Sequence, residues 1–207
     1  MHIELTEMLA CPEPHAPDVL VLSTAQMKGR VVQFGLVGCP VCRKEYLIAN
    51  GVVDFRGRGT GDVGRGPAST PPPSPVPRPS DVPTLQALLD LSGPGGFVVL
   101  LGDATRHAAG LAKLMGGIHF IGVNAPAGVQ SSPDLSLLVA PRGIPLRASV
   151  ARGVVVGASM ARAPWLEEAV RVLLPGRRLV IEGESAGRPA GVKQLAEGEG
   201  VWVGEKG

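Results

Sequence analysis

Three thiols and one imidazole near the start of the chain have the spacing of a metal site. They are Cys11, His15, Cys39 and Cys42, and the three cysteines are the only ones in a chain of 207 residues. Two ligand pairs at this separation are typical of a zinc ribbon, in which two tight turns hold one tetrahedral ion. The N-terminal region is therefore predicted to be a small module that zinc stabilises.

The fourth ligand is the irregular part of this pattern. A regular knuckle has its second cysteine three positions after the first, but Pro14 stands there and His15 follows it. Besides the site with His15, the residues are compatible with a three-thiolate site completed by His2 or water, and with an eroded ribbon that binds no metal. We expect the site with His15, since cysteine and histidine are the usual donors of structural zinc.

Short apolar segments around these ligands predict a small β-structure. Alternating or continuous apolar residues mark strands at 19–22, 30–34, 45–48 and 52–55. A module of residues 1–57 buries too little apolar surface to be stable unaided. Zinc binding is therefore expected to supply a large part of its folding free energy.

The segment 58–83 is rich first in glycine and then in proline, a composition typical of a linker between domains. We place the domain boundary in this segment. The chain is thus predicted to consist of an N-terminal module (1–57), a linker (58–83) and a C-terminal domain (84–207). The two folded parts are expected to unfold independently of each other.

Strand and helix patterns alternate through residues 84–207. Strands are expected at 97–101, 119–123, 135–140, 153–156, 178–182 and 200–204, and helices at 85–91, 106–115, 164–173 and 192–196. This alternation predicts an α/β fold with a doubly wound, Rossmann-like sheet that is truncated at six strands. Two links between strands are too short for helices, so we expect the zinc module, a partner or a second copy to cover part of one face.

Charge and hydropathy exclude several classes of protein. The net charge is only +2 and no region is strongly basic, which argues against nucleic-acid binding. No apolar run reaches the length of a membrane helix, and the first residues lack the pattern of a signal peptide. We therefore expect a cytoplasmic protein whose reduced cysteines bind metal rather than form disulfides.

The N-terminal segments resemble a known family. Residues 5–12 (LTEMLACP), 39–42 (CPVC) and 46–55 (YLIANGVVDF) are similar to the Trm112-like zinc-ribbon family. Members of that family are small zinc-binding partners that activate or stabilise S-adenosylmethionine-dependent methyltransferases. The resemblance implies a structural zinc ion and a role related to methyltransferases, while Pro14 and His15 depart from the cysteine that the family has there.

The C-terminal segments resemble class I S-adenosylmethionine-dependent methyltransferases. Residues 144–146 (IPL), 153–159 (GVVVGAS) and above all 165–181 (WLEEAVRVLLPGRRLVI) carry this similarity. The resemblance implies a methyltransferase-like fold. It also implies that Gly102 and Asp103, after the first strand, and Asn124, after the second, correspond to cofactor-binding residues of the family.

These cofactor-binding positions depart from the family's pattern. The glycine-rich loop that lets the backbone approach the cofactor is reduced to Gly102, with bulkier residues after it. Asn124 replaces the acidic residue that binds the ribose hydroxyls, and Arg142 follows the third strand where the family has an aspartate. Tight binding of S-adenosylmethionine is therefore not expected, and no catalytic residue is assigned.

The residues favour a methyltransferase-like pseudoenzyme that is fused to a zinc ribbon. Its role would be to bind, stabilise or scaffold a protein partner, or to assemble with copies of itself. The alternative is an active S-adenosylmethionine-dependent methyltransferase with an atypical cofactor loop. The two hypotheses differ in whether the loop at 102–106 leaves room for the cofactor.

Overall fold

The computed structural model describes residues 1–15, 19–57, 81–183 and 188–207. The described residues up to 57 form one 3-10 helix and four strands. They are the 3-10 helix Ile3–Met8, β1 (Val21–Lys28), β2 (Val31–Gly38), β3 (Glu45–Ala49) and β4 (Val52–Asp54). Consecutive strands pair antiparallel, and Asn50 and Gly51 make the tight turn before β4 with positive φ angles.

The described residues from 81 onward alternate between strands and helices. The helices are α1 (Val82–Leu89), α2 (Ala108–Leu114) and α3 (Trp165–Val172), and 3-10 turns lie at Gly102–His107 and Ala158–Met160. The strands are β5 (Phe97–Leu101), β6 (His119–Val123), β7 (Leu135–Val139), β8 (Ala151–Val156), β9 (Leu173–Glu182), β10 (Val192–Gly198) and β11 (Val201–Lys206). The predicted α/β fold class is confirmed.

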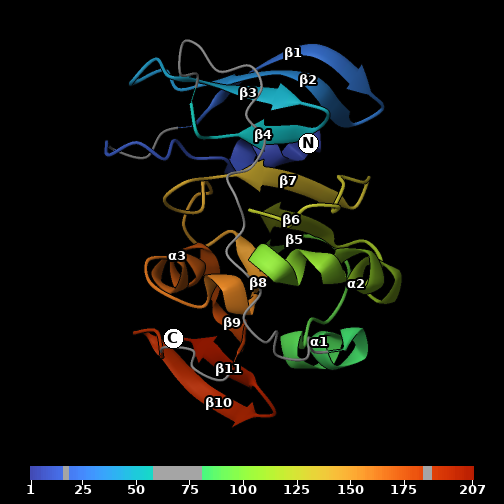
Figure 1. The fold of residues 1–207 in the computed structure, drawn as a ribbon, viewed down its shortest axis with the longest axis vertical. Helices are drawn as coiled ribbons and strands as arrows, with labels where there is room; N and C mark the ends of the chain where they lie inside the picture. The colour runs from blue at the N-terminus through green and yellow to red at the C-terminus, as the bar shows by residue number, and fades with distance from the viewer. Residues whose placement is uncertain (16–18, 58–80, 184–187) are drawn as a thin grey trace.

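All the strands named above belong to one sheet. Its order is β1-β2-β3-β4-β7-β6-β5-β8-β9-β11-β10, and Figure 1 shows it running along the longest axis of the molecule. From β7 to β9 neighbouring strands are parallel, whereas β11 is antiparallel to both β9 and β10. Numbered from β5, the C-terminal order 3-2-1-4-5 is that of a doubly wound Rossmann-like sheet.

The predicted truncation at six strands is wrong, because the segment expected to be a helix at 192–196 is strand β10. Its hairpin to β11 turns at Glu199 and Gly200, which both have positive φ angles, 51° and 76°. Two such residues in succession make the tight turn that matches the twist of paired strands. The hairpin therefore overrides a local apolar spacing that fits a helix, and the C-terminal sheet has seven strands.

The N-terminal strands join the C-terminal sheet through a parallel contact between β4 and β7. Val53 pairs with Leu138, and the backbone N–H of Phe55 donates to the carbonyl of Val139 at 2.7 Å. The edge beyond β7 is thus filled by the chain itself, and the edges of the full sheet are β1 and β10. The N-terminal strands therefore extend the C-terminal sheet beyond β7.

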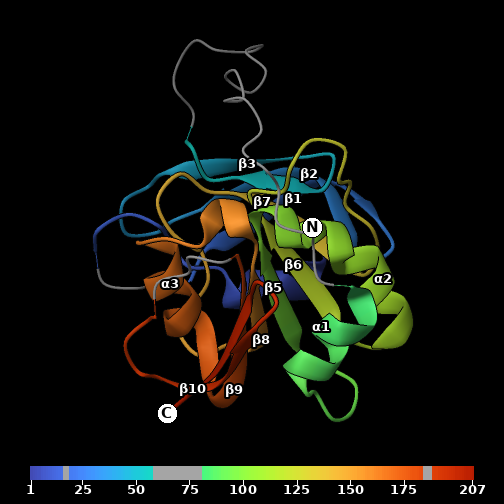
Figure 2. The same cartoon turned by 60° about the horizontal axis from the view of Figure 1, so that its bottom comes forward.

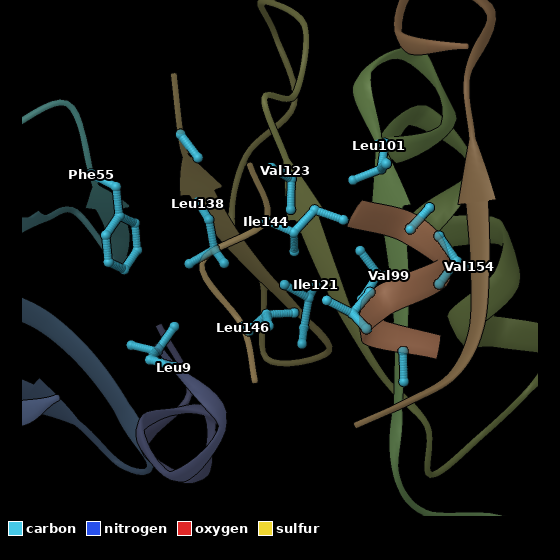
Figure 3. Close-up of a cluster of buried hydrophobic side chains, with 14 of the residues drawn as sticks. Leu9, Phe55, Val99, Leu101, Ile121, Val123, Leu138, Ile144, Leu146 and Val154 are labelled. Atoms are coloured by element: carbon cyan, nitrogen blue, oxygen red, sulfur yellow. The ribbon is translucent and has the colours of Figure 1, made fainter. Parts of the chain in front are cut away.

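Helices cover the two faces of the sheet unequally. Figure 2 shows α1 and α2 on one face and α3 on the other. Next to α3 the N-terminal segment completes the cover, since Leu9 forms a β-bridge with Leu146 and both side chains are fully buried. Figure 3 shows Leu9 and Phe55 in one apolar cluster with Leu138, Ile144 and Leu146. Of the three covers expected for the bare face, the structure has the N-terminal part of the chain.

The start of α1 lies inside the segment predicted as linker. Its first residue is Val82, and the side chain of Asp81 caps the helix by accepting a hydrogen bond from the N–H of Thr84. The rest of the predicted linker, residues 58–80, lies outside the described residues. No helix in the described part of the chain has the length and hydropathy needed to cross a membrane.

Candidate functional site

The four predicted metal ligands come together at one end of the N-terminal strands. Cys11 follows the segment that bridges to residue 146, while Cys39 and Cys42 lie in the turn after β2. The ligand atoms of these three cysteines and of His15 all lie within 4.8 Å of one another. Cys39 is buried, and the other three are partly exposed. The cluster could therefore hold a metal ion near the surface.

Two separations between ligand atoms match those expected around a tetrahedral zinc ion. The sulfurs of Cys11 and Cys42 are 3.7 Å apart, and the Cys39 sulfur lies 3.4 Å from Nε2 of His15. A tetrahedral ion with Zn–S bonds of about 2.3 Å and a Zn–N bond of about 2.0 Å would hold two sulfurs about 3.8 Å apart, and sulfur and nitrogen about 3.5 Å apart. The donor set and its geometry both suit structural zinc.

The turn after β2 is shaped to present its two sulfurs. The N–H of Cys39 donates to the carbonyl of Lys44, the N–H of Arg43 donates back to the carbonyl of Cys39, and Arg43 adopts a positive φ of 60°. The backbone N–H of Lys44 also hydrogen-bonds the sulfur of Cys42. Such N–H groups stabilise the thiolate form that a metal ion requires.

The two partly exposed thiols, Cys11 and Cys42, differ in acidity. Burial alone would raise the pKa of Cys42, but the N–H of Lys44 and the side chains of Cys39 and His15 lower it to about 7. Burial raises the pKa of Cys11 to about 11, although the Tyr46 hydroxyl and the N–H of Glu13 oppose this shift. Metal binding must therefore displace the proton of Cys11 at neutral pH.

His2 does not belong to the cluster. Its ring lies against His119 at the start of β6, with the ring centroids 5.0 Å apart. The backbone N–H of His2 donates to Oγ of Ser136, which also contacts Nε2 of His119 at 2.9 Å. Of the open alternatives for the fourth ligand, the geometry thus favours His15 over His2.

The carboxyl ends of β5 and β8 mark the second candidate site. In a doubly wound sheet, ligands bind in the crevice where the strand order reverses, which here lies between these two strands. Gly102 and Asp103 lie in the 3-10 turn that follows β5, and the turn Ala158–Met160 follows β8. The side chain of Asp103 is 40% exposed, and its carboxylate lies 4.0 Å from the guanidinium of Arg106.

The two turns at this position pack directly on each other. Gly102 is buried with a φ of +57°, and a Cβ atom there would lie 2.7 Å from Oγ of Ser159 and 2.9 Å from Cγ of Met160. Met160 is itself 93% buried, since its exposed fraction is 7%. The side chain of Met160 therefore occupies the space beside Gly102, which the sequence predicts to be a cofactor-binding residue.

Asn124 lies away from that turn and has a different set of partners. Its Nδ2 donates to the carbonyl of Ala140 at 2.8 Å, and the N–H of Ala140 donates to its Oδ1 at 2.9 Å. The side chain thus joins the end of β6 to the end of β7. Arg142, three residues after β7, is exposed.

Two features of the site are not singled out by the sequence pattern. His107 is largely buried, and its Nε2 lies 3.5 Å from Oε1 of Glu182. Tyr46, expected only as a strand residue, contacts the sulfur of Cys11 with its hydroxyl. A signal for Tyr46 existed, because it is the one tyrosine of the chain and follows the Cys42 knuckle closely.

No protein-family model matches the sequence, and no curated protein matches it. Solved structures with similar folds include the antibiotic-resistance methyltransferase Kmr, at 17% identity and a TM-score of 0.42, over 61% of this chain and 93% of that one. A SAM-dependent methyltransferase from Aquifex aeolicus is 16% identical with a TM-score of 0.44, over 60% of this chain and 87% of that one.

A third similar structure is a complex of the Haloferax volcanii Trm112 methyltransferase activator with a putative methyltransferase. It is 25% identical with a TM-score of 0.39, and the match covers 48% of this chain and 50% of that chain. Two of these three structures are methyltransferases, and the third is a complex that contains a putative one.

Proposed function

We propose that this protein is a methyltransferase-like pseudoenzyme that binds a protein partner, and that its N-terminal part is a Trm112-like ribbon holding one zinc ion. Cys11, His15, Cys39 and Cys42 would be the ligands of that ion. With all four positions filled by protein atoms, the ion would be structural and would contribute folding free energy rather than chemistry. Reduced thiols of this kind suit the cytoplasm.

The observation that carries the pseudoenzyme proposal is the contact between the turns after β5 and β8. The crevice at the reversal of strand order is where a doubly wound fold binds its ligand. In this chain Met160 and Ser159 lie against Gly102 at that position. A cofactor could enter only if the two turns separated, which would expose the buried Met160 side chain.

The residue at the end of β6 supports the same proposal. A carboxylate offers two acceptor oxygens to ribose hydroxyls, whereas the Asn124 amide offers one. That oxygen already accepts from the N–H of Ala140, while Nδ2 donates to the carbonyl of Ala140. Releasing the amide for a ligand would leave the N–H and carbonyl of Ala140 unpaired, which costs free energy in a partly buried place. Gly102, Asp103 and Asn124 are therefore proposed to be structural remnants of a cofactor site.

A binding role is supported by apolar side chains that the ribbon leaves exposed. Val21 is 60% exposed, Phe34 39% and Leu47 40%, on strands β1, β2 and β3. The outermost of these strands, β1, also has a free edge, to which another chain can add a strand. A protein partner or a second copy of the chain is the proposed occupant.

The first test is a calorimetric titration of S-adenosylmethionine and S-adenosylhomocysteine into zinc-loaded protein. We expect no binding up to millimolar ligand. Micromolar binding would overturn the pseudoenzyme proposal and favour the alternative of an active methyltransferase. Light scattering after size-exclusion chromatography, and mass spectrometry of co-purified proteins, test the second half of the proposal. A strict monomer that retains no partner would contradict it.

A further inference from the structure

We propose that Tyr46 is a positioning residue of the metal centre, whose hydroxyl holds the sulfur of Cys11 in place. The inference rests on the proposed zinc site and adds to it a residue that does not touch the metal. The Tyr46 hydroxyl lies 3.5 Å from the sulfur of Cys11, within the range of a hydrogen bond to sulfur. Tyr46 is 1% exposed, so the contact is shielded from water.

The direction of this hydrogen bond follows from the chemistry of the sulfur. A cysteine that binds metal has lost its proton and can only accept, so the tyrosine hydroxyl must donate to it. A buried hydroxyl without a partner is costly, which favours the geometry in which the Cys11 sulfur stays within reach. Tyr46 and the metal ion would thus both favour the same position of Cys11.

The ring of Tyr46 is held firmly enough to perform this role. It packs against the ring of Phe55, with centroids 4.8 Å apart and an angle of 42° between the planes. Phe55 is 2% exposed and its backbone is hydrogen-bonded to Val139 of β7. The ring that carries the hydroxyl is therefore held by its packing against a residue that is anchored to the sheet.

Cys11 is the ligand that needs such support. Cys39 and Cys42 share one turn that is closed by its own backbone hydrogen bonds, whereas Cys11 stands on a separate segment before Pro12. Outer partners of this kind change metal affinity by about 10-fold to 100-fold when removed. They also lower the electron density on the sulfur, which a spectrum of the bound metal can report.

The test compares Tyr46→Phe with Ile48→Val in the full-length protein. Ile48 lies on the same strand, is fully buried and offers no hydrogen bond, so its truncation reports a packing change alone. We measure zinc affinity by competition with a chelator, and the energy of the sulfur-to-cobalt charge-transfer band after loading with Co²⁺. For Tyr46→Phe we expect affinity about 10-fold to 100-fold weaker and a band shifted to lower energy. Ile48→Val should leave the band where it is in the natural sequence.

A second measurement does not depend on how well Tyr46→Phe folds. Because the chain has one tyrosine, biosynthetic replacement by 3,5-difluorotyrosine changes this residue alone. The more acidic phenol is a stronger donor, so the charge-transfer band should shift to higher energy. An unchanged band in both Tyr46→Phe and the fluorinated protein would overturn the role of Tyr46 while leaving the zinc site standing. Failure of the unmodified protein to bind zinc or Co²⁺ would overturn the zinc site and the role of Tyr46 together.

Discussion

Asn124 and Ala140 are joined by two hydrogen bonds, one in each direction, between a side-chain amide and a backbone peptide group. Asn124 has a φ of 53°, so the residue also supports a left-handed backbone conformation that asparagine tolerates well. The position that the resemblance assigns to ribose binding is thereby used to hold two strand ends together. A substitution that breaks one of the two hydrogen bonds therefore tests whether Asn124 has a structural role.

Asn124→Asp should destabilise the protein without creating cofactor binding. The aspartate cannot donate to the carbonyl of Ala140, so we expect a loss of about 1–2 kcal/mol in the free energy of unfolding, measured with urea. Asn50→Asp is the matched control, because Asn50 has a φ of 51° and lies in an exposed turn. Its effect should stay within about 0.5 kcal/mol. Calorimetric binding of S-adenosylmethionine to Asn124→Asp would contradict the remnant-site interpretation.

Gly102→Ala should be more destabilising than Gly29→Ala. Both glycines have φ near +60°, but a Cβ at Gly29 would meet nothing within 4 Å, whereas one at Gly102 would clash with Ser159 and Met160. The backbone strain alone costs about 1–2 kcal/mol, and the clash should add about 1–3 kcal/mol at Gly102. Thermal or urea unfolding of both variants gives the difference. Equal losses would mean that the two turns do not pack as described.

Substitution of Cys39, a proposed metal ligand, should lower the stability of both parts of the chain. Strand β4 lies in the same sheet as β7, and one apolar cluster spans both parts of the chain. We expect Cys39→Ser to lower the melting temperature in a single transition that far-UV circular dichroism and tryptophan fluorescence report together. Both tryptophans, Trp165 and Trp202, lie in the C-terminal part. A tryptophan signal unchanged by the substitution would instead support the independent unfolding that the sequence predicts.

Acid should destabilise the contact between His2 and His119. Burial, followed by the neighbouring His2, lowers the pKa of His119 from its ordinary 6.5 to about 4. The folded protein thus binds this proton less tightly than the unfolded chain does. The contribution is fully present above pH 6.5 and is lost as the pH falls toward 4. Allowing for partial exposure, we expect a loss of about 2 kcal/mol.

The measurement for His119 is the difference in unfolding free energy between the natural sequence and His119→Gln across this pH range. Glutamine can still hydrogen-bond Ser136, so the two proteins should differ in how steeply stability falls with acid. Protonation of the proposed zinc ligands should affect both proteins equally and so cancel in the difference. Parallel curves from pH 8 to 4 would show that His119 does not titrate as described.

Local patterns predict strands well where burial is complete. The strands predicted at 97–101 and 119–123 coincide with β5 and β6. A strand that is buried on both faces consists mainly of apolar residues, so its sequence is easy to recognise. The local pattern of β10 predicts a helix instead of a strand, because the segment has few apolar residues and is mostly exposed. Its conformation is decided by the turn at Glu199 and by pairing with β11.

The candidate metal site could be proposed from residue types alone, since the four ligands are cysteine and histidine at knuckle spacing. Residue spacing cannot predict the pairing of Val53 with Leu138, because this contact joins two strands that are far apart in the sequence. Nor can it predict that Met160 would lie against Gly102. Both contacts are set by the assembled sheet rather than by any short segment.

The parallel pairing of β4 with β7 also has a consequence during synthesis. The ribosome completes β4 well before β7, and at about 5–20 residues per second the wait is on the order of ten seconds. An unpaired strand edge is open to association with other nascent chains during such an interval. At three residues, β4 is the shortest strand of the sheet described here, which keeps that temporary edge small.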